Sequence, residues 1–319
     1  MTILIDGDLL LYKCCAAAEV ETVWDDNLIT MHSSISAVRL LLADAVDTLR
    51  SKLGRRRKVI ITLSHRDNFR KMLEPTYKGN RISKKPIGYL QAVEYVREAW
   101  DTVTLPALEA DDVMGIMATS GRYKDPIIVT EDKDLKQIDC SIFNPRTNEF
   151  VAHDPMFHMV QTLAGDRADG YGGCPGYGEI SARKLLESLQ PEEWWPAIVA
   201  AYVKKGLTES EALLQARLAY MLQSRNYNRG KIKLWEPTPV PASGATAKSP
   251  KPATAPKKPS SAKKPSSKTP KESSTKAARP TTVTKRARTA PRTPRTTTTG
   301  RSSRSPSSRK TSSRSTKAT

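Results

Sequence analysis

Ile3-Leu4-Ile5-Asp6-Gly7-Asp8, near the start of the chain, is a short apolar run that stops at two aspartates. It predicts a buried strand that ends at a turn, followed by a helix from Leu9 to Ala18. Comparable apolar runs occur further along the chain, at Val59–Leu63, Thr102–Leu105 and Pro126–Thr130. Helical patterns separate them, at Ser34–Leu53, at Ala110–Ser120 and from Leu135 onward. Strands that alternate with helices indicate an α/β body whose central, mainly parallel sheet is flanked by helices.

Charge divides the chain of 319 residues into two parts. The 52 Lys and Arg and the 33 Asp and Glu give a net charge of +19, but residues 243–319 alone contain 21 of the basic residues and one acid, Glu272. This segment has a single large aliphatic residue, Val283, and no aromatic residue. It cannot bury enough apolar surface to offset its chain entropy, so we expect a disordered basic tail over 237–319. The remaining body is nearly neutral and long enough for a sizeable core.

Several classes of protein are excluded by composition. No run approaches the roughly 20 apolar residues of a membrane span, and Asp6 and Asp8 interrupt the apolar N-terminus, so a secretory signal is not expected. Four cysteines without metal-ligand spacing, two of them adjacent at Cys14 and Cys15, favour reduced thiols and a cytoplasmic location.

Acidic residues gather where the predicted strands end. In an open parallel sheet, functional groups collect at the carboxyl ends of the strands. The first three of the following four groups should therefore converge: Asp6 with Asp8, Glu109 with Asp111 and Asp112, Asp132 with Asp134, and Asp166 with Asp169. Each group alone could be an ordinary helix cap or solvated turn, since Asp near a helix start stabilises the helix dipole.

Convergent carboxylates repel one another unless a cation lies between them. Oxygen-rich acidic sites suit Mg²⁺ or Mn²⁺. Two such ions about 4 Å apart can activate a water molecule and stabilise the leaving oxygen of a phosphodiester. The sequence therefore predicts a two-metal site for phosphodiester hydrolysis.

The body resembles the 5′-nuclease superfamily of flap endonucleases, and in particular the duplex-specific 5′→3′ exonucleases of short-tailed DNA phages. The resemblance extends from about Ile3 to Trp235 and is carried by five motifs in order: Ile5-Asp6-Gly7-Asp8; Phe69-Arg70 with Tyr77-Lys78-Gly79-Asn80-Arg81; Leu108-Glu109-Ala110-Asp111-Asp112; Asp132-Lys133-Asp134-Leu135; and Gly165-Asp166-Arg167-Ala168-Asp169. It implies metal ligands at Asp6, Glu109, Asp111, Asp112, Asp132, Asp134, Asp166 and Asp169. Many relatives carry another residue at Asp8. The family usually has one more acid before its Phe-Arg, which here is absent or displaced to Asp67.

The resemblance implies that basic residues near the predicted site contact the DNA substrate. Lys84 and Lys85 follow Tyr77–Arg81 in a segment that leads into a helical arch in relatives, although a solvated charged face is the simpler interpretation. The resemblance places Lys78 and Arg81 near the scissile phosphate, with Arg70 in support. Cations there would offset charge that develops on phosphate oxygens.

A glycine-rich segment, Gly173-Cys174-Pro175-Gly176-Tyr177-Gly178, precedes a predicted helix at Ser181–Leu189. Glycines at a helix N-terminus can leave backbone amides free to bind phosphate, although a tight turn alone would also account for them. The segment resembles the family's helix–three-turn–helix, which grips duplex DNA and often uses a K⁺ ion. That resemblance assigns DNA contacts to Gly173, Gly176, Gly178, Ser181, Arg183 and Lys184. Ile180 replaces a usual Lys.

The predicted organisation is a nuclease domain over 1–160, a duplex-binding subdomain over 161–236 and the tail, whose composition resembles histone-linker C-terminal domains and suits counterion-displacing DNA binding. The sequence thus predicts a Mg²⁺- or Mn²⁺-dependent 5′→3′ exonuclease on double-stranded DNA that releases 5′-phosphorylated products. The resemblance adds cleavage of RNA in RNA–DNA hybrids and location in the cytoplasm of a bacterial host. The alternatives are a flap endonuclease and a non-catalytic DNA-condensing protein.

Overall fold

The central sheet has the strand order β5-β4-β1-β6-β7-β8 in the computed structural model, which describes residues 1–81 and 84–238. The first five strands in this order pair in parallel and β8 pairs antiparallel with β7. Their bounds are β1 Thr2–Asp6, β4 Lys58–Thr62, β5 Asp101–Val103, β6 Pro126–Val129, β7 Ser141–Asn144 and β8 Glu149–Val151. The predicted α/β class with a mainly parallel sheet is confirmed. The predicted tail lies outside the described residues, apart from Pro237 and Thr238.

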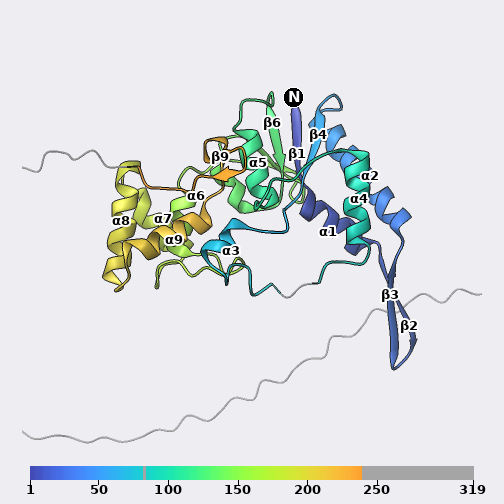
Figure 1. The fold of residues 1–319 in the computed structure, drawn as a ribbon, viewed down its shortest axis with the longest axis horizontal. Helices are drawn as coiled ribbons and strands as arrows, with labels where there is room; N and C mark the ends of the chain where they lie inside the picture. The colour runs from blue at the N-terminus through green and yellow to red at the C-terminus, as the bar shows by residue number, and fades with distance from the viewer. Residues whose placement is uncertain (82–83, 239–319) are drawn as a thin grey trace, which may run out of the picture. The chain divides into compact units, whose positions relative to one another are not determined.

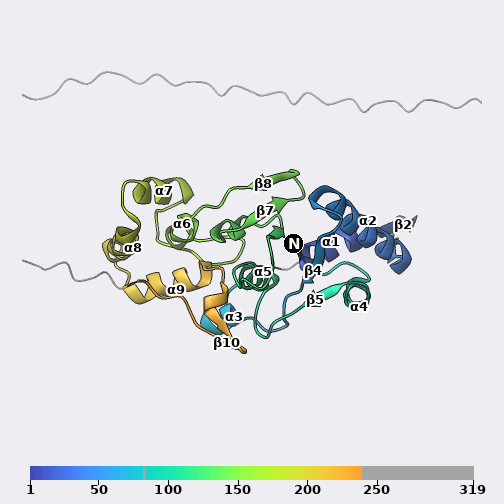
Figure 2. The same ribbon diagram turned by 90° about the horizontal axis from the view of Figure 1, so that it is seen from above.

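Helices cover both faces of the sheet because its strands are apolar on both sides (Figures 1 and 2). Ile3 and Ile5 of β1 pack in one core with α1 (Gly7–Ala17), α2 (Ile35–Leu53) and α4 (Tyr89–Ala99). Leu4, which points the other way, packs in a second core with α5 (Ala110–Ala118). The predicted helix after Leu135 is a 3₁₀ helix, η1 (Lys133–Gln137).

A helical region follows the sheet in the sequence. It contains α6 (Phe157–Ala164), α7 (Glu179–Glu187), α8 (Pro191–Lys204) and α9 (Glu209–Ala219), and a short pair of strands, β9 (Tyr227–Asn228) and β10 (Lys231–Ile232), comes after η2 (Ser224–Asn226). Val160 and Leu163 of α6 pack in one apolar core with α7, α8 and α9. The predicted domain boundary at residues 160–161 therefore falls inside α6. All described helices are too short or too polar to span a membrane.

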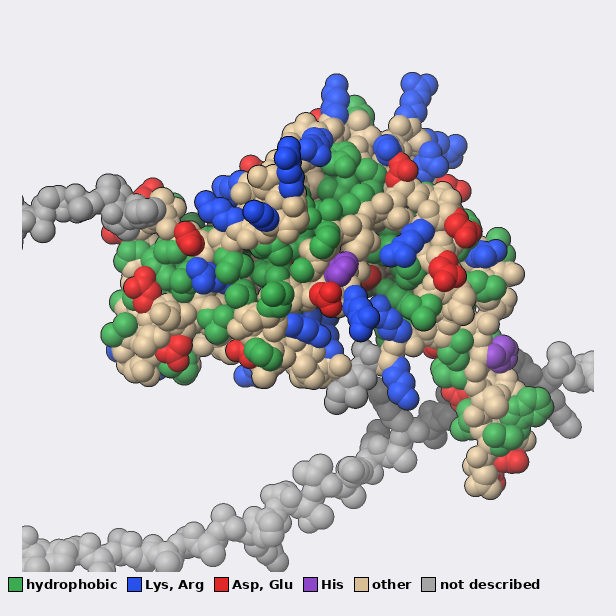
Figure 3. Space-filling view, in the orientation of Figure 1, with side chains coloured by type: hydrophobic (Ala, Val, Ile, Leu, Met, Phe, Trp, Pro, Cys, Tyr) green, Lys and Arg blue, Asp and Glu red, His purple; other side chains and the backbone are tan. Residues whose placement is uncertain are grey.

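Two segments differ from the sequence-based expectation. Residues 19–33, for which no strand was predicted, form a hairpin of β2 (Glu19–Asp25) and β3 (Leu28–Ser33) that projects from the body (Figure 1). Apolar side chains lie on its surface (Figure 3), among them the exposed Val23, Trp24 and Ile29. The segment between α3 (Phe69–Leu73) and α4, for which a helical arch was expected, is turn and irregular chain over 74–81 and 84–88.

His158 gives the helical region a predictable response to acid. It is 6% exposed, its Nε2 lies 2.8 Å from the carbonyl oxygen of Ala216, and burial lowers its pKa from 6.5 to about 4. Between about pH 6.5 and pH 4, His158 is therefore protonated in the unfolded chain but neutral in the folded chain. The free energy of unfolding should fall by about 2–3 kcal/mol as the pH drops through this range. Chemical denaturation across this range should show a shallower loss for His158→Gln. The exposed His32→Gln should behave like the wild type, and equal slopes for all three proteins would contradict the assignment.

Candidate active site

An acidic cavity of about 460 Å³ lies at the carboxyl ends of β1, β4 and β6. We call it the carboxylate basin. Two cations, Lys78 and Arg81, reach it from the segment after α3. The acids that line it come from separate parts of the chain: Asp6, Asp8, Glu109, Asp111, Glu131 and Asp132. The structure thus brings together the acids of the first three predicted groups, except for Asp112 and Asp134.

Strand register places Asp6 at the centre of this edge. Asp6 pairs with Thr62 of β4, and Ile5 pairs with Val129 of β6, so the chain after β6 runs beside Asp6. The Thr130 hydroxyl donates to Asp6 Oδ2 at 3.2 Å, and the Leu9 amide donates to Oδ1 at 3.1 Å, which makes Asp6 the N-cap of α1. Asp6 is therefore both a helix cap and a member of the basin.

The start of α5 supplies two further acids in different environments. Glu109 Oε1 accepts from Lys78 Nζ at 2.5 Å, and Oε2 accepts from the Tyr77 hydroxyl at 3.1 Å. Burial alone would raise the pKa of Glu109, but the Lys78 and Arg70 cations outweigh it and the pKa is lowered. By contrast, Asp111 Oδ1 is buried and has no hydrogen-bond partner among the described residues.

Lys78 and Arg81 are anchored to the basin by Asp169. Arg81 Nη2 donates to Asp169 Oδ1 at 2.6 Å, and Lys78 Nζ lies 3.6 Å from Oδ2. The Lys78 backbone, at φ 55°, donates to the carbonyl oxygen of Asp169 at 2.7 Å. The single Tyr77 hydroxyl proton is shared between Glu109 Oε2 and Asp169 Oδ2, and the latter is nearer, at 2.8 Å. Asp169 therefore positions the two cations from behind the basin.

The remaining predicted acids lie beside the basin. Asp134 accepts from Gln161 Nε2 at 2.7 Å, and Asp166 pairs with Lys133 Nζ at 3.1 Å. Asp132 caps η1 by accepting from the Asp134 amide at 2.8 Å. After burial, the charges of Asp132, Asp169 and Asp166 contribute to a raised pKa of Asp134, so these acids are near one another, but neither Asp134 nor Asp166 lines the cavity.

Carboxylates that share this space hold protons more tightly than usual. Burial, followed by the charges of Asp8 and Asp132, raises the pKa of Asp6 to about 7. Burial and the charge of Asp132 raise the pKa of Asp134 to about 7 as well. The pKa values of Asp111 and Asp132 are also raised, chiefly by burial and then by neighbouring acids. Such a set of acids carries unfavourable negative charge at neutral pH unless a further cation compensates it.

Arg70 and Asp112, predicted as a catalytic residue and a metal ligand, do not line the basin and pair with each other instead. Both side chains are 0% exposed, and Arg70 donates to both Asp112 oxygens, at 2.6 and 2.9 Å. Arg70 also donates to the carbonyl oxygens of Leu218 and Tyr220, at 2.9 and 2.7 Å. With its oxygens occupied, Asp112 is a partner of Arg70 and not a presented metal ligand. Arg70 ties α3 to α5 and to the end of α9, and touches the site only through Glu109 Oε2 at 3.4 Å.

Asp8, and not Asp67, lies where the family's additional acid is expected. Asp67 lies outside the basin and is exposed, with its amide donating to His65 Nδ1. The Ser64 amide instead donates to Asp8 Oδ2 at 3.3 Å, and the Tyr89 hydroxyl donates to Oδ1 at 3.1 Å. The Asp8 carboxylate therefore lies at the end of β4, beside the 63–67 stretch in which the family's additional acid is expected. The basin is also lined by three residues for which the sequence predicted no role: Tyr12, Ser64 and Glu131.

The donor set of the basin fits a hard divalent cation. Asp111 Oδ1 lacks a partner and the neighbouring acids have raised pKa values, so a cation would relieve both conditions. As the described side chains stand, however, no three Asp, Glu, His or Cys are arranged to hold one ion. The ammonium of Lys78 occupies part of the acidic space through Glu109. Side-chain adjustment around Asp6, Asp111 and Asp132 is required for metal binding.

Two of the backbone amides that were predicted to bind phosphate donate hydrogen bonds within the protein instead. The Gly173 amide donates to Gln215 Oε1, and the Gly178 amide donates to Ser181 Oγ, both at 2.9 Å. Gly173 also has φ 64°, and a Cβ there would lie 2.3 Å from the Gly165 amide nitrogen, so close backbone packing requires this glycine. Gly176 has φ 87° and is exposed. This segment is therefore at least partly a tight structural turn.

The predicted basic contacts are unequally free to meet DNA. Arg183 Nη2 pairs with Asp154 Oδ2 at 2.6 Å, whereas Lys184 is exposed. Lys84 is exposed, and Lys85 Nζ lies over the Tyr89 ring, 3.8 Å from its centroid. Lys84 and Lys184 are therefore the more available of these cations.

Comparison with known proteins identifies the sheet-bearing part of the chain. Residues 1–155 match the family model described as "5'-3' exonuclease, N-terminal resolvase-like domain". This part of the chain is therefore similar to a 5′–3′ exonuclease N-terminal domain. All acids of the carboxylate basin, together with Lys78 and Arg81, lie within the residues that match this family model.

Two curated phage proteins are similar to most of the described body. The exodeoxyribonuclease of Enterobacteria phage T3 is 29% identical over 281 aligned residues, which cover 74% of this chain and 92% of the relative. The exonuclease of Escherichia phage T7 is 27% identical, with 74% and 93% covered. The chain is thus similar to these two phage proteins over nearly their whole length. Among solved structures, T5 5′-exonuclease with bound zinc ions matches with a TM-score of 0.49 and 16% identity, covering 68% of this chain and 88% of that one.

Proposed function

We propose that this chain is a divalent-metal-dependent exonuclease that degrades double-stranded DNA in the 5′→3′ direction and releases 5′-phosphorylated products. One observation carries the proposal: six acids and two cations surround a single cavity at the carboxyl edge of the sheet. A protein that only bound DNA would have no use for clustered carboxylates, because they repel phosphate.

Asp6, Asp111 and Asp132 are the residues that would hold Mg²⁺ or Mn²⁺, with Asp8 and Asp134 nearby. When bound, a pair of such ions supplies an activated water and charge compensation for the leaving oxygen. The chain itself supplies Lys78 and Arg81, which line the basin and can stabilise negative charge on the scissile phosphate. Glu109 and Asp169 hold these cations in place through the ion pairs described above.

Three finer features belong to the same proposal and rest on the resemblance of the sequence. These are cleavage of RNA in RNA–DNA hybrids, a K⁺ ion at the Gly173–Gly178 turn, and duplex contacts by Ser181, Lys184 and their neighbours. A cytoplasmic location in a bacterial host stands on the same footing.

Two DNA substrates test the proposal against its alternatives. A linear duplex labelled at one 3′ end should shorten in Mg²⁺ while it keeps the label, and EDTA should stop the reaction. A circular duplex with a single nick, at which a 5′ flap is displaced, should lose only the flap if the protein is a flap endonuclease. Recovery of both substrates intact but bound would indicate a DNA-condensing protein and would contradict the proposal.

Replacement of Lys78 tests the role of the basin cations. Lys78→Ala should lower the single-turnover rate at saturating enzyme by about 100-fold, because one well-placed donor to developing charge is lost. The control is Lys71→Ala, which removes an exposed lysine of α3 outside the basin and should leave the rate unchanged. If Lys78→Ala weakens only the affinity for DNA and leaves the single-turnover rate unchanged, Lys78 contributes to DNA binding and not to the reaction.

Truncation after Ala242 tests the division of the chain. The shortened protein loses a charge of +20 but none of the basin residues, and should still degrade duplex DNA with 5′→3′ polarity. Log affinity falls with log salt by about 0.9 per neutralised phosphate, so the full chain should show a much steeper slope. Affinities for long duplex DNA at four salt concentrations provide the measurement. A full-length chain with Gln in place of the tail Lys and Arg should follow the truncated protein, and equal slopes for all three would exclude DNA contact by the tail.

A further inference from the structure

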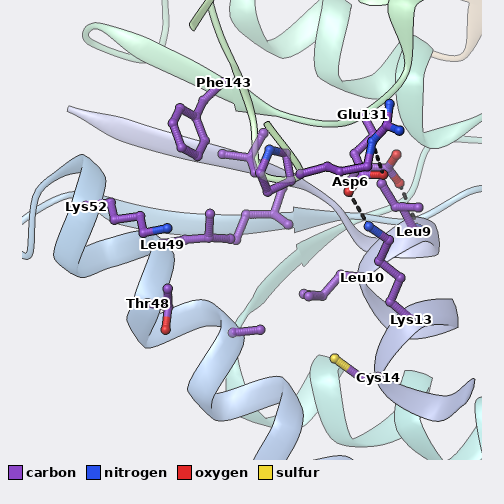
Figure 4. A pocket seen from close by; sticks show the side chains of 15 residues that line it. Asp6, Leu9, Leu10, Lys13, Cys14, Thr48, Leu49, Lys52, Glu131 and Phe143 are labelled. Carbon is purple, nitrogen blue, oxygen red and sulfur yellow. Dashed lines mark hydrogen bonds and ion pairs between the residues drawn. The ribbon is translucent and has the colours of Figure 1, made fainter. Parts of the chain in front are cut away.

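A second cavity, of about 260 Å³, adjoins the carboxylate basin on the side of α1 and α2 (Figure 4). Its walls are mainly apolar and include Leu10 and Cys14 of α1, Ala45 and Leu49 of α2, and Phe143 of β7. Protein interiors are close-packed, with few voids larger than a water molecule. An apolar cavity of about 150 Å³ is already large enough to bind benzene. This cavity is therefore large enough for a planar ring system.

The two cavities share part of their lining. Asp6, Leu9 and Glu131 line both of them. Figure 4 shows Asp6 and Glu131 together at one end of the apolar cavity, with Lys13 directed toward Glu131. The two cavities are therefore adjacent, and a group bound in one lies beside a group bound in the other.

Cations line the cavity beside its apolar walls. Lys13 pairs with Glu131, and Arg146 Nε lies 3.6 Å from Glu131 Oε2. Lys52 Nζ donates to Asn148 Oδ1 at 2.7 Å. Lys13 and Arg146 lie at the Glu131 end of the cavity and Lys52 lies at the opposite end (Figure 4), so the lining carries three cations against the two acids Asp6 and Glu131. Such a combination suits a ligand with an aromatic part and a negatively charged part.

We propose that this cavity is a subsite for the base of the 5′-terminal nucleotide, unpaired from its partner while its phosphodiester lies in the basin. The inference rests on the proposed function, because it deepens the description of the same active site. Pockets for drug-sized ligands measure roughly 300–1,000 Å³, so this smaller cavity admits one base and not a dinucleotide. That limit agrees with removal of residues from the end of a strand.

The chemistry of the walls predicts little choice among the four bases. Phe143 offers an aromatic ring for stacking, which every base can use. The polar lining consists mostly of charged side chains that already have partners. Few donors and acceptors are therefore free to distinguish one base from another by hydrogen bonding. A base would keep its polar edge toward the charged residues and solvent, since burial of an unpaired polar group is unfavourable.

Binding of deoxyadenosine to the full chain in EDTA tests the subsite without any cleavage. An uncharged nucleoside avoids attraction to the basic tail, and deoxyribose serves as the ligand without a base. We expect deoxyadenosine to bind at least about tenfold more tightly than deoxyribose, by NMR titration. Ala45→Leu, which fills the cavity from α2, should remove this difference. Ala43→Leu adds the same side chain to the same helix outside the cavity lining and should preserve it.

A terminal abasic nucleotide tests the same idea during digestion. Wild type should remove a normal 5′-terminal nucleotide about tenfold faster than an abasic one, whereas Ala45→Leu should treat the two alike. Equal binding of deoxyadenosine and deoxyribose by the wild type, or an unchanged preference in folded Ala45→Leu, would overturn the subsite. Complete lack of cleavage would contradict the proposed function instead, and the binding experiment would still decide on the cavity.

Discussion

Asp111→Asn should abolish cleavage of duplex DNA, lowering the single-turnover rate by at least about 10³-fold, while binding of the duplex is retained. The change removes a negative ligand from the centre of the basin and leaves all basic residues in place. Asp111 has a strongly raised pKa and a buried oxygen that finds no hydrogen-bond partner within residues 1–81 and 84–238. Loss of its charge should therefore tighten DNA binding slightly, because repulsion of phosphate is reduced.

The same substitution should not weaken the fold. In metal-free protein the buried Asp111 carboxylate is unfavourable, so a neutral amide of the same shape should leave the free energy of unfolding unchanged or raise it. Asp132→Asn should behave similarly in the cleavage assay. The exposed Asp47→Asn on α2 is the matched control and should digest DNA normally. Near wild-type digestion by Asp111→Asn in Mg²⁺ would exclude the assigned site.

The sheet and the position of the basin could be predicted because both depend on short local patterns. Apolar runs at Ile3–Ile5, Val59–Leu63 and Pro126–Thr130 form buried strands, as is typical of short β-branched runs in the interior of a parallel sheet. Acids placed directly after these strands must meet at one edge when the strands pair in parallel. Asp6 and Asp132 accordingly lie together, and Asp111 joins them from the first turn of α5.

Features that depend on contacts between distant segments could not be predicted. Asp111 and Asp112 are adjacent in the sequence, but a helix turns neighbouring side chains about 100° apart, so one faces the basin and the other faces Arg70. The position of Asp8 at the end of β4 depends on the Ser64 amide, 56 residues away. The exposed hairpin at residues 19–33 lacks a buried face, so it has no hydrophobic alternation that relates to a core.

Arg70→Met should destabilise the protein by about 3–5 kcal/mol, because it leaves the Asp112 carboxylate buried without its partner. Arg70 satisfies both oxygens of Asp112 and two backbone carbonyls, and all of these groups are shielded from water. Arg70→Lys should also be destabilising, since an ammonium cannot reproduce the planar, two-pronged geometry. Chemical denaturation monitored by circular dichroism provides the measurement.

The double variant Arg70→Met with Asp112→Leu separates a structural role from a catalytic one. It replaces the buried ion pair by apolar side chains and should recover much of the lost stability, since apolar replacements of buried pairs are often neutral. If Arg70 acts only through the fold, the recovered protein should also regain most of its single-turnover cleavage rate. A stable double variant that stays inactive, with Lys78 and Arg81 intact, would show that Arg70 acts on the reaction itself through Glu109, the one basin residue that it touches. Full stability of Arg70→Met alone would contradict the buried ion pair.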